Sequence, residues 1–305
     1  MPAIIAAAGS RGIRRFVEFF LAEIENDNTR LAYGRAVSQF LRWAESRGID
    51  ALARVTPMAV AAYIRVVKTS RSTPTAKQHL AALRMLFDYL VTGHVMEVNP
   101  AWSVRGPKHI VTKGSTPVLS PEEVRQLVDS IPTGTLSGLR DRAVIAVMIY
   151  SFARVGAVCA MKLCDFFTEG RRASFRLHEK GGKEHVVKAH HVAEAAVDAY
   201  LRAAGLDDPS TPLFQSIGLT GRLTGRPMTR NDSLRMVKRR CRAAGLSQTT
   251  CNHSFRAVGI TSYMRNGGDI KTAASIAGHS STRTTQLYDR SGDEVSLDEI
   301  ERITI

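Results

Sequence analysis

The sequence predicts a mainly α-helical chain with a small antiparallel sheet, an α+β fold built from two domains. Apolar residues recur at helical spacing through most of the chain, one short stretch alternates around a glycine turn, and one aperiodic segment (GPKHIVTKGSTP) divides the sequence. A chain of 305 residues is long enough for two hydrophobic cores. We expect an all-α N-terminal domain over 1–105, a linker over 106–117, a mixed, mostly helical domain over 118–290, and a C-terminal tail helix over 291–305.

Four helices are expected in the N-terminal domain. Apolar residues at helical spacing predict the first over Ile13 to Ile24, and the second begins at an Asn28–Thr29 cap and ends at Gly48. The third opens at Thr56–Pro57, because threonine caps a helix and proline fits its first turn. The fourth runs from about Pro74 to Val91.

The second domain also begins with helices. Ser120, followed by two glutamates, is a capping residue with an acidic first turn, and it opens a helix through Val128. The apolar run from Leu139 to Val158 predicts one continuous buried helix. Helices resume from about Val192.

A β-hairpin is expected between these helices. Residues 174–178 and 185–188 alternate in polarity on either side of the turn Glu179–Lys183, which contains two glycines. This is the small antiparallel sheet of the predicted fold.

One stretch, from Arg222 to Arg242, is strongly basic: it holds eight Lys and Arg residues against a single acid, Asp232. Thr229 and Asp232 form a capping box, and Gly245 ends the helix. A solvated helix face normally pairs its charges at i,i+4, and this stretch lacks the carboxylates for that pairing. We therefore expect contacts to phosphate from Arg235, Lys238, Arg239 and Arg242.

The charge balance favours a polyanionic partner. The chain carries 42 Lys and Arg against 28 Asp and Glu, a net charge of +14, and the excess is spread over both domains. The four cysteines form neither a CxxC pair nor a zinc ribbon, so we expect reduced thiols. No apolar run approaches membrane-spanning length, and the basic residues follow rather than precede the apolar start, the reverse of a secretory signal. We expect a cytoplasmic protein.

Several common catalytic sites are excluded by spacing. The turn Glu179–Lys183 lacks the first glycine and the Ser or Thr of a phosphate-binding P-loop, and His178 has no second histidine at the HExxH spacing. There is no GxSxG motif and no carboxylate cluster for a two-metal nuclease. We expect chemistry with no metal and no cofactor.

The most specific indication of function is a set of short polar motifs that occur in a defined order. Asn252–Arg256 reads NHSFR, and 26 residues after its histidine the segment Ala277–Ser281 reads AGHSS. Tyr288 follows nine residues after His279. Upstream, Ser151–Val155 reads SFARV.

Together these segments resemble the tyrosine recombinase, or phage integrase, family over about residues 13–290. His253 and Arg256 match the family's HxxR box, and Ala277–His279 matches its (L/A)GH motif. The stretch TRLAYGRAVSQFLRW, which begins at Thr29, resembles the family's helical core-binding domain. The resemblance implies six catalytic residues: Arg154, Lys180, His253, Arg256, His279 and Tyr288.

The resemblance also assigns their roles. Tyr288 forms a 3′-phosphotyrosyl link with DNA, His253 assists as acid or base, and His279 hydrogen-bonds the phosphate. Arg154 and Arg256 hold the negative charge of the transition state, which suits guanidinium because it stays charged and offers paired donors. Lys180 protonates the leaving 5′ oxygen, with Lys183 in the same turn as its rival.

Three positions depart from the family pattern. The family usually has an acidic residue three positions after its first catalytic arginine, where it orients the guanidinium. Here that arginine is Arg154 and the position holds Ala157, so another acceptor must orient Arg154. In the family's H-x-L-R-H pattern, Phe255 stands in place of leucine and Ala257 in place of the final histidine. Taken singly, each catalytic residue also has an ordinary structural explanation, such as a helix cap or a solvated turn, but these do not explain the joint order and spacing.

We therefore expect a site-specific recombinase that cleaves and rejoins double-stranded DNA without ATP, as a homotetramer on two duplexes at the nucleoid. The alternatives are a type IB topoisomerase-like activity and a catalytically silent DNA-binding regulator. In the tail, a Ser296–Glu299 capping box opens a short amphipathic helix that docks on its own domain or, as the resemblance favours, on a neighbouring protomer. The DNA target, and insertion against excision or dimer resolution, are left open by the sequence.

Overall fold

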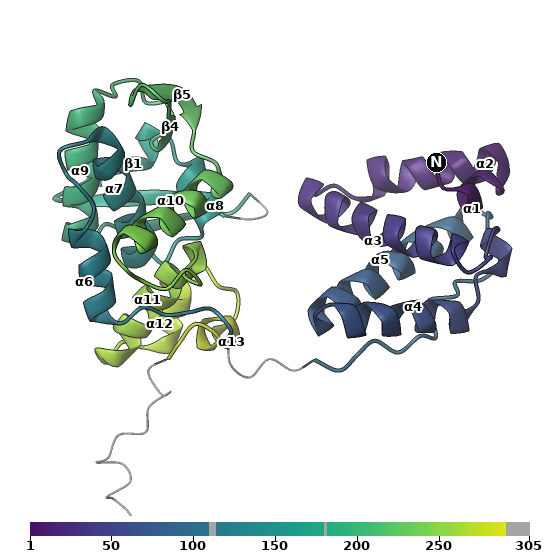
Figure 1. Ribbon diagram of the computed structural model, residues 1–305. Helices are drawn as coiled ribbons and strands as arrows, with labels where there is room; N and C mark the ends of the chain where they lie inside the picture. The colour runs from purple at the N-terminus through teal and green to yellow at the C-terminus, as the bar shows by residue number, and fades with distance from the viewer. Residues whose placement is uncertain (110–113, 180–181, 291–305) are drawn as a thin grey trace, which may run out of the picture. The chain divides into compact units, whose positions relative to one another are not determined.

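The computed structural model describes residues 1–109, 114–179 and 182–290, and the chain divides into two compact units, residues 1–110 and 111–305 (Figure 1). The first unit is all helical, and the second combines helices with two small antiparallel sheets. The predicted mainly α fold with a small sheet is therefore confirmed. Within the described residues, no helix is both long and apolar enough to cross a membrane.

The first unit consists of helices around an aromatic-rich core. Phe40 and Phe87 are fully buried, and their rings meet edge to face with centroids 6.0 Å apart. The elements are α1 (Ala3–Ala6), α2 (Gly9–Glu18), the π-helical turn η1 (Phe19–Glu23), α3 (Asp27–Glu45), η2 (Leu52–Arg54), α4 (Pro57–Ser70) and α5 (Thr73–Thr92).

The N-terminal caps of two helices can be compared with the caps that the sequence predicts. At α4, the Thr56 side chain accepts from the backbone N–H of Ala59, as expected. At α3, the prediction of an Asn28–Thr29 cap was wrong: the cap is Asn26, whose side-chain oxygen accepts from the N–H groups of residues 28 and 29. An asparagine two residues earlier satisfies the free N–H groups equally well, so several polar residues in a row leave the start ambiguous.

The second unit carries the sheets and the remaining helices. Helix α7 packs against α9 and α11. The elements are α6 (Pro121–Asp129), α7 (Leu136–Tyr150), α8 (Val155–Ala160), η3 (Leu163–Asp165), β1 (Phe166–Glu169), β2 (Arg172–His178), β3 (Glu184–Lys188), α9 (His191–Ala204), β4 (Gln215–Ile217), β5 (Leu223–Pro227), α10 (Arg230–Ala243), α11 (Asn252–Arg265), α12 (Ile270–Ile276) and α13 (Thr282–Gln286).

The predicted hairpin is present as β2 and β3, in the order β1-β2-β3. Phe175 pairs with Val187 and Leu177 with His185, and Phe175 and Leu177 are fully buried against the helical core. Strand β1 and the β4–β5 hairpin were not expected from the sequence. Both are short, and β5 is mostly exposed, so neither produces an alternating apolar pattern.

The expected single helix over Leu139 to Val158 was wrong. Helix α7 ends at Tyr150, Phe152 adopts a left-handed φ of 53°, and α8 begins at Val155. The sequence has no proline at this break. The carbonyl of Phe152 instead accepts a hydrogen bond from Arg256 of α11, so a partner 104 residues away holds the turn.

Candidate active site

The break between α7 and α8 places Arg154 at the N-cap of α8, facing the hairpin. Its Nη1 donates to Oε2 of Glu179 over 2.6 Å. The Arg154 side chain is 36% exposed, whereas that of Glu179 is only 8% exposed. One N–H edge of the guanidinium is thus bound to a buried carboxylate, while the Arg154 side chain as a whole remains partly accessible to solvent.

Arg256 lies at the centre of the site and is completely buried. It donates to the carbonyls of Phe152 and Ala277, the latter over 2.7 Å, and to Nε2 of His279. Within the described residues its Nε has no hydrogen-bond partner. Burial and the nearby charge of Arg154 lower the pKa of Arg256 to about 10, so it stays protonated at neutral pH.

The close approach of α11 to α7 depends on Gly259. A Cβ at this position would overlap the carbonyl oxygen of Ile149 and the ring of Phe152. Glycine therefore lets the helix that carries Arg256 lie directly against the break in front of Arg154.

His279 is a neutral histidine whose tautomer follows from its partners. Because Arg256 can only donate, Nε2 of His279 accepts, and Nδ1 carries the proton and donates to Oγ1 of Thr285 over 2.8 Å. Burial, followed by the charges of Arg256 and Arg154, lowers the pKa of His279 to about 3. Gly278, with φ of 59°, makes the turn that points this histidine back toward α11.

Tyr288 lies next to these residues, two positions after α13 ends. Its ring stacks on His279 with centroids 5.7 Å apart, and the centroid of the His253 ring is 6.4 Å away. The Arg256 guanidinium carbon lies 5.5 Å from the Tyr288 ring centroid. The tyrosine is half-buried.

The backbone around Tyr288 is held on both sides. The Thr261 hydroxyl donates to the Tyr288 carbonyl over 3.0 Å and accepts from the N–H of Arg290 over 3.2 Å. The Arg290 side chain donates to the carbonyl of Gly114, and a Cβ at Gly114 would overlap the carbonyl of Leu287. The segment before Tyr288 therefore lies directly on residue 114.

His253, at the start of α11, keeps an exposed edge beside Tyr288. Partial burial lowers its pKa first, and the positive charges of Arg256 and Arg154 lower it further. A neutral imidazole at pH 7 can accept a proton, which is the state that a general base needs.

Lys180, the expected general acid, lies outside the described residues. Its rival Lys183 is exposed, and its carbonyl accepts from the N–H of Glu179 over 2.8 Å, which closes the hairpin turn. Phe255 and Ala257, which depart from the family pattern, are both fully buried in the core and carry no polar group toward the site.

The basic helix α10 has a mixed environment. Arg239 and Arg240 both bind the buried carboxylate of Asp141, at 3.0 and 2.8 Å, and Lys238 donates to the carbonyl of Gln248. By contrast, Arg242 is exposed, and Arg235 has an 81% exposed side chain with only a 3.7 Å pairing to Asp232.

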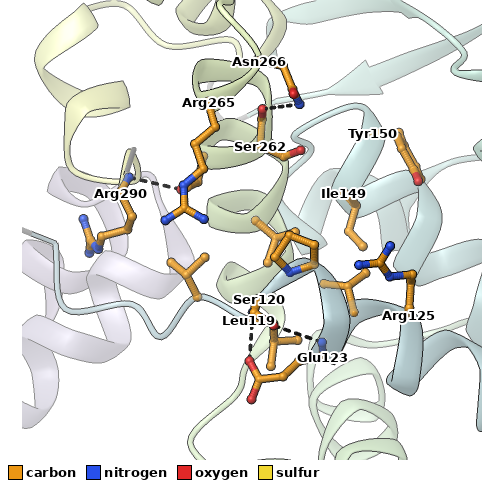
Figure 2. A pocket seen from close by; sticks show the side chains of 15 residues that line it. Leu119, Ser120, Glu123, Arg125, Ile149, Tyr150, Ser262, Arg265, Asn266 and Arg290 are labelled. Carbon is orange, nitrogen blue, oxygen red and sulfur yellow. Dashed lines mark hydrogen bonds between the residues drawn. The ribbon is translucent and has the colours of Figure 1, made fainter. Parts of the chain in front are cut away.

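The same unit holds a cavity of about 700 Å³ beside α6 and α11 (Figure 2). Apolar side chains, Leu119, Val124, Ile149 and Val258, form part of its wall. Cationic side chains also line it: Arg125, Arg265 and Arg290.

Five of the six expected catalytic residues therefore lie in described parts of the chain, and Arg154, His253, Arg256, His279 and Tyr288 surround one site. Sequence reasoning missed Glu179, Thr285 and Thr261. Glu179 had a signal, since Ala157 left a place for a carboxylate and Glu179 begins the hairpin turn. The two threonines had none, because their role depends on tertiary contacts alone.

Comparisons with known proteins cover both units of the chain. The model described as Phage integrase family matches residues 117–294, and the one described as Phage integrase, N-terminal SAM-like domain matches residues 13–94. Tyrosine recombinase XerC of Myxococcus xanthus is 28% identical over 284 residues, covering 89% of this chain and 91% of the relative. Tyrosine recombinase XerD of Bifidobacterium longum is 26% identical over 303 residues, covering 95% and 96%.

Solved structures share the fold. The XerH recombinase bound to a palindromic difH substrate in a post-cleavage complex superposes with a TM-score of 0.73 at 16% identity, covering 95% of both chains. A lambda integrase dimer bound to a COC′ core site gives a TM-score of 0.71 at 19% identity, covering 93% of this chain and 78% of that one.

Proposed function

The chain belongs to the phage integrase family and is a tyrosine-type site-specific recombinase, and from this premise we propose that Tyr288 cleaves duplex DNA and stays linked to its 3′ phosphate. The observation that carries the proposal is the position of Tyr288, whose ring lies beside His279 and 5.5 Å from the Arg256 guanidinium carbon. The relatives are recombinases, so neither a topoisomerase-like activity nor a silent regulator is favoured.

The proposed cleavage step is an in-line displacement at phosphorus. The Tyr288 oxygen forms the new bond to phosphorus, His253 takes the phenolic proton, and the bond between phosphorus and the 5′ oxygen breaks. Lys180 gives a proton to the leaving oxygen. Rejoining is the reverse reaction with a 5′ hydroxyl from the partner strand, so the ester retains the bond energy and no ATP is consumed.

The two arginines and His279 would stabilise the phosphate. Arg154 and Arg256 place fixed cations where charge develops in the transition state, which is the largest contribution that a site of this kind makes. In the free protein, His279 is held neutral mainly by burial and by these same cations. A bound phosphate offsets the cations, which raises the pKa of His279 and lets Nε2 become a donor to the phosphate.

The proposed ligand is double-stranded DNA, held by both domains: the core-binding domain over 1–105 and the catalytic domain over 118–290. The net charge of +14 supports this assignment. On α10, Arg235, Lys238, Arg239 and Arg242 are proposed to contact phosphates, and Arg235 and Arg242 are the most available. We expect the protein to act at the nucleoid, in the cytoplasm, where this substrate is found.

The proposed assembly is a homotetramer on two duplexes. One of the structural neighbours is a lambda integrase tetramer bound to a Holliday junction. In this chain, the cavity of Figure 2 joins apolar walls to cationic residues, and the tail sequence joins Leu297, Ile300, Ile303 and Ile305 to acidic residues. This complementarity supports docking of the tail of one protomer in the cavity of the next.

A suicide substrate tests the function. With a nick beside the scissile phosphate, cleavage releases a short fragment and traps the protein on DNA. Wild-type protein should be trapped, and Tyr288→Phe should bind DNA nearly as well but never be trapped, because one hydroxyl is lost. Tyr263→Phe is the matched control, since Tyr263 packs on Phe152 in the same unit and should leave trapping intact. Covalent capture of the Tyr288→Phe protein contradicts the assignment.

A further inference from the structure

The geometry points to Glu179 as the positioning residue that orients Arg154 for the phosphate, in place of the carboxylate that the sequence lacks at position 157. The inference rests on the proposed function, because it assigns Glu179 a part in the same cleavage step. The carboxylate that orients Arg154 then comes from the β2–β3 hairpin and not from α8, the helix that Arg154 caps.

Position 157 cannot supply the brace. Arg154 is the N-cap of α8 and residue 157 is at N3, the position whose side chain reaches back to the N-cap in a capping box. Alanine has no acceptor to offer there, and Ala157 is packed in the core with 3% of its surface exposed. The guanidinium must therefore be oriented by a residue from another element.

Glu179 meets that requirement. Its Oε2 accepts from Nη1 of Arg154 over 2.6 Å, a short charge-assisted bond. Among the residues that the structure describes, Glu179 is the carboxylate paired with Arg154. Because its side chain is 8% exposed, loss of the arginine would leave a nearly buried charge unpaired, which is costly.

The carboxylate is itself held in place from two sides. The N–H of Glu179 donates to the carbonyl of Lys183 over 2.8 Å, which fixes the backbone at the hairpin turn. On the other side, a Cβ at Gly278 would lie 3.7 Å from Cγ of Glu179, so the turn before His279 packs against the side chain. His185 of β3 donates to the carbonyl of Ile276 over 2.9 Å and ties the hairpin to α12.

Charge balance gives Glu179 a second effect. The positive charge of Arg154 lowers the pKa of Arg256, and Glu179 acts in the opposite direction by raising the pKa of Arg256. Before DNA binds, the carboxylate thus offsets repulsion between the two cations. When the phosphate binds, Arg154 can keep one N–H on Glu179 and direct its remaining donors at the phosphate.

The test measures cleavage of the nicked suicide substrate by fully DNA-bound protein. Glu179→Gln keeps the shape of the side chain and removes its charge, and we expect cleavage to slow by about 10- to 100-fold, as when other groups that orient a catalytic residue are lost. Glu179→Asp should keep more activity than Glu179→Gln. The matched control is Glu184→Gln on the same hairpin, where a 64% exposed carboxylate should be dispensable.

A double-mutant cycle shows whether Glu179 acts through Arg154. In an Arg154→Ala background the Glu179→Gln change should have almost no further effect on cleavage, because its target is gone. A full additional loss in that background overturns the inference, as does a wild-type cleavage rate in the single Glu179→Gln variant. If the wild-type protein is never trapped, it is the proposed function that fails.

Discussion

At the residue scale, Arg256 determines how the site is put together. Its guanidinium reaches the break after α7 through Phe152, the turn after α12 through Ala277, and the imidazole of His279. These segments are distant in the sequence, and one fully buried cation is bonded to all of them. Removing it would disconnect the site as well as remove a proposed phosphate ligand.

The first residue prediction concerns the leaving group. A positioned proton donor contributes about 10²- to 10⁴-fold in rate, so Lys180→Ala should slow cleavage by that order. A substrate with sulfur in place of the 5′ bridging oxygen needs no proton on departure and should restore the rate of Lys180→Ala. Lys183→Ala is the control, and rescue of that variant instead would transfer the acid role to Lys183.

The second residue prediction concerns pH. The pKa of His279 is about 3 in the folded protein and rises to its ordinary value near 6.5 on unfolding. Below pH 6.5 His279 therefore binds a proton in the unfolded chain but not in the folded chain. The free energy of unfolding falls as the pH falls toward 3.

Chemical denaturation at a series of pH values measures this effect. Between pH 6.5 and 4 the wild-type free energy of unfolding should fall more steeply than that of His279→Gln, which lacks the titrating group. Above pH 7.5 the two slopes should agree. Equal slopes over the acid range would mean that His279 is not held neutral in the fold.

At this scale, the sequence could predict those site residues that lie at fixed spacings in motifs. Motif order indicated Arg154, His253, Arg256, His279 and Tyr288 together, because the chemistry needs those residue types in one place. Ala157 indicated that another acceptor must orient Arg154, but the sequence did not identify Glu179 as that acceptor, since a glutamate in a turn is ordinarily a solvated charge.

At the element scale, the break between α7 and α8 shows where local pattern fails. The run from Leu139 to Val158 is strongly apolar, with no charged residue between Arg142 and Arg154, and periodicity alone supports one helix. The hydrogen bond from Arg256 of α11 to the carbonyl of Phe152 stabilises the break. A short window of sequence cannot reveal a partner so far along the chain. The β2–β3 hairpin was predictable for the opposite reason, because alternation and turn glycines are local signals.

The element prediction concerns α10. If its exposed cations contact phosphates, each lost contact should reduce the slope of log K against log salt by about 0.9, so the Arg235→Ala/Arg242→Ala double variant should lose about 1.8. The preferred DNA sequence should hardly change, because phosphate contacts carry little sequence information.

Arg240→Ala is the matched control for that measurement. Arg240 is only 13% exposed and binds the buried Asp141 at 2.8 Å, so its loss should lower Tm and leave the salt slope unchanged. If the double variant keeps the wild-type slope, the exposed face of α10 is a solvated surface.

At the scale of the whole molecule, assembly is proposed to depend on the tail. Deleting residues 295–305 should leave binding to a single DNA site nearly intact, because the proposed DNA contacts lie elsewhere. Paired-duplex complexes and strand exchange should be weakened. Gel-shift titration followed by a recombination assay measures both quantities on the same preparations.

A charge reversal at the cavity provides the companion to that deletion. Arg265→Glu should weaken synapsis in the same direction, since the tail that it would meet is acidic. A truncated protein that assembles and recombines at the wild-type rate would show that the tail packs on its own domain or is dispensable.

The contacts of Thr261 bear on which subunit would cut which strand in the proposed tetramer. Its single hydroxyl joins the backbone at Tyr288 and at Arg290 to α11, the helix that also carries His253 and Arg256. A tyrosine anchored in this way would act from its own subunit. Each protomer would then cut the half-site that it occupies, and inactivation of one protomer would remove cleavage at one strand position while its partners keep theirs.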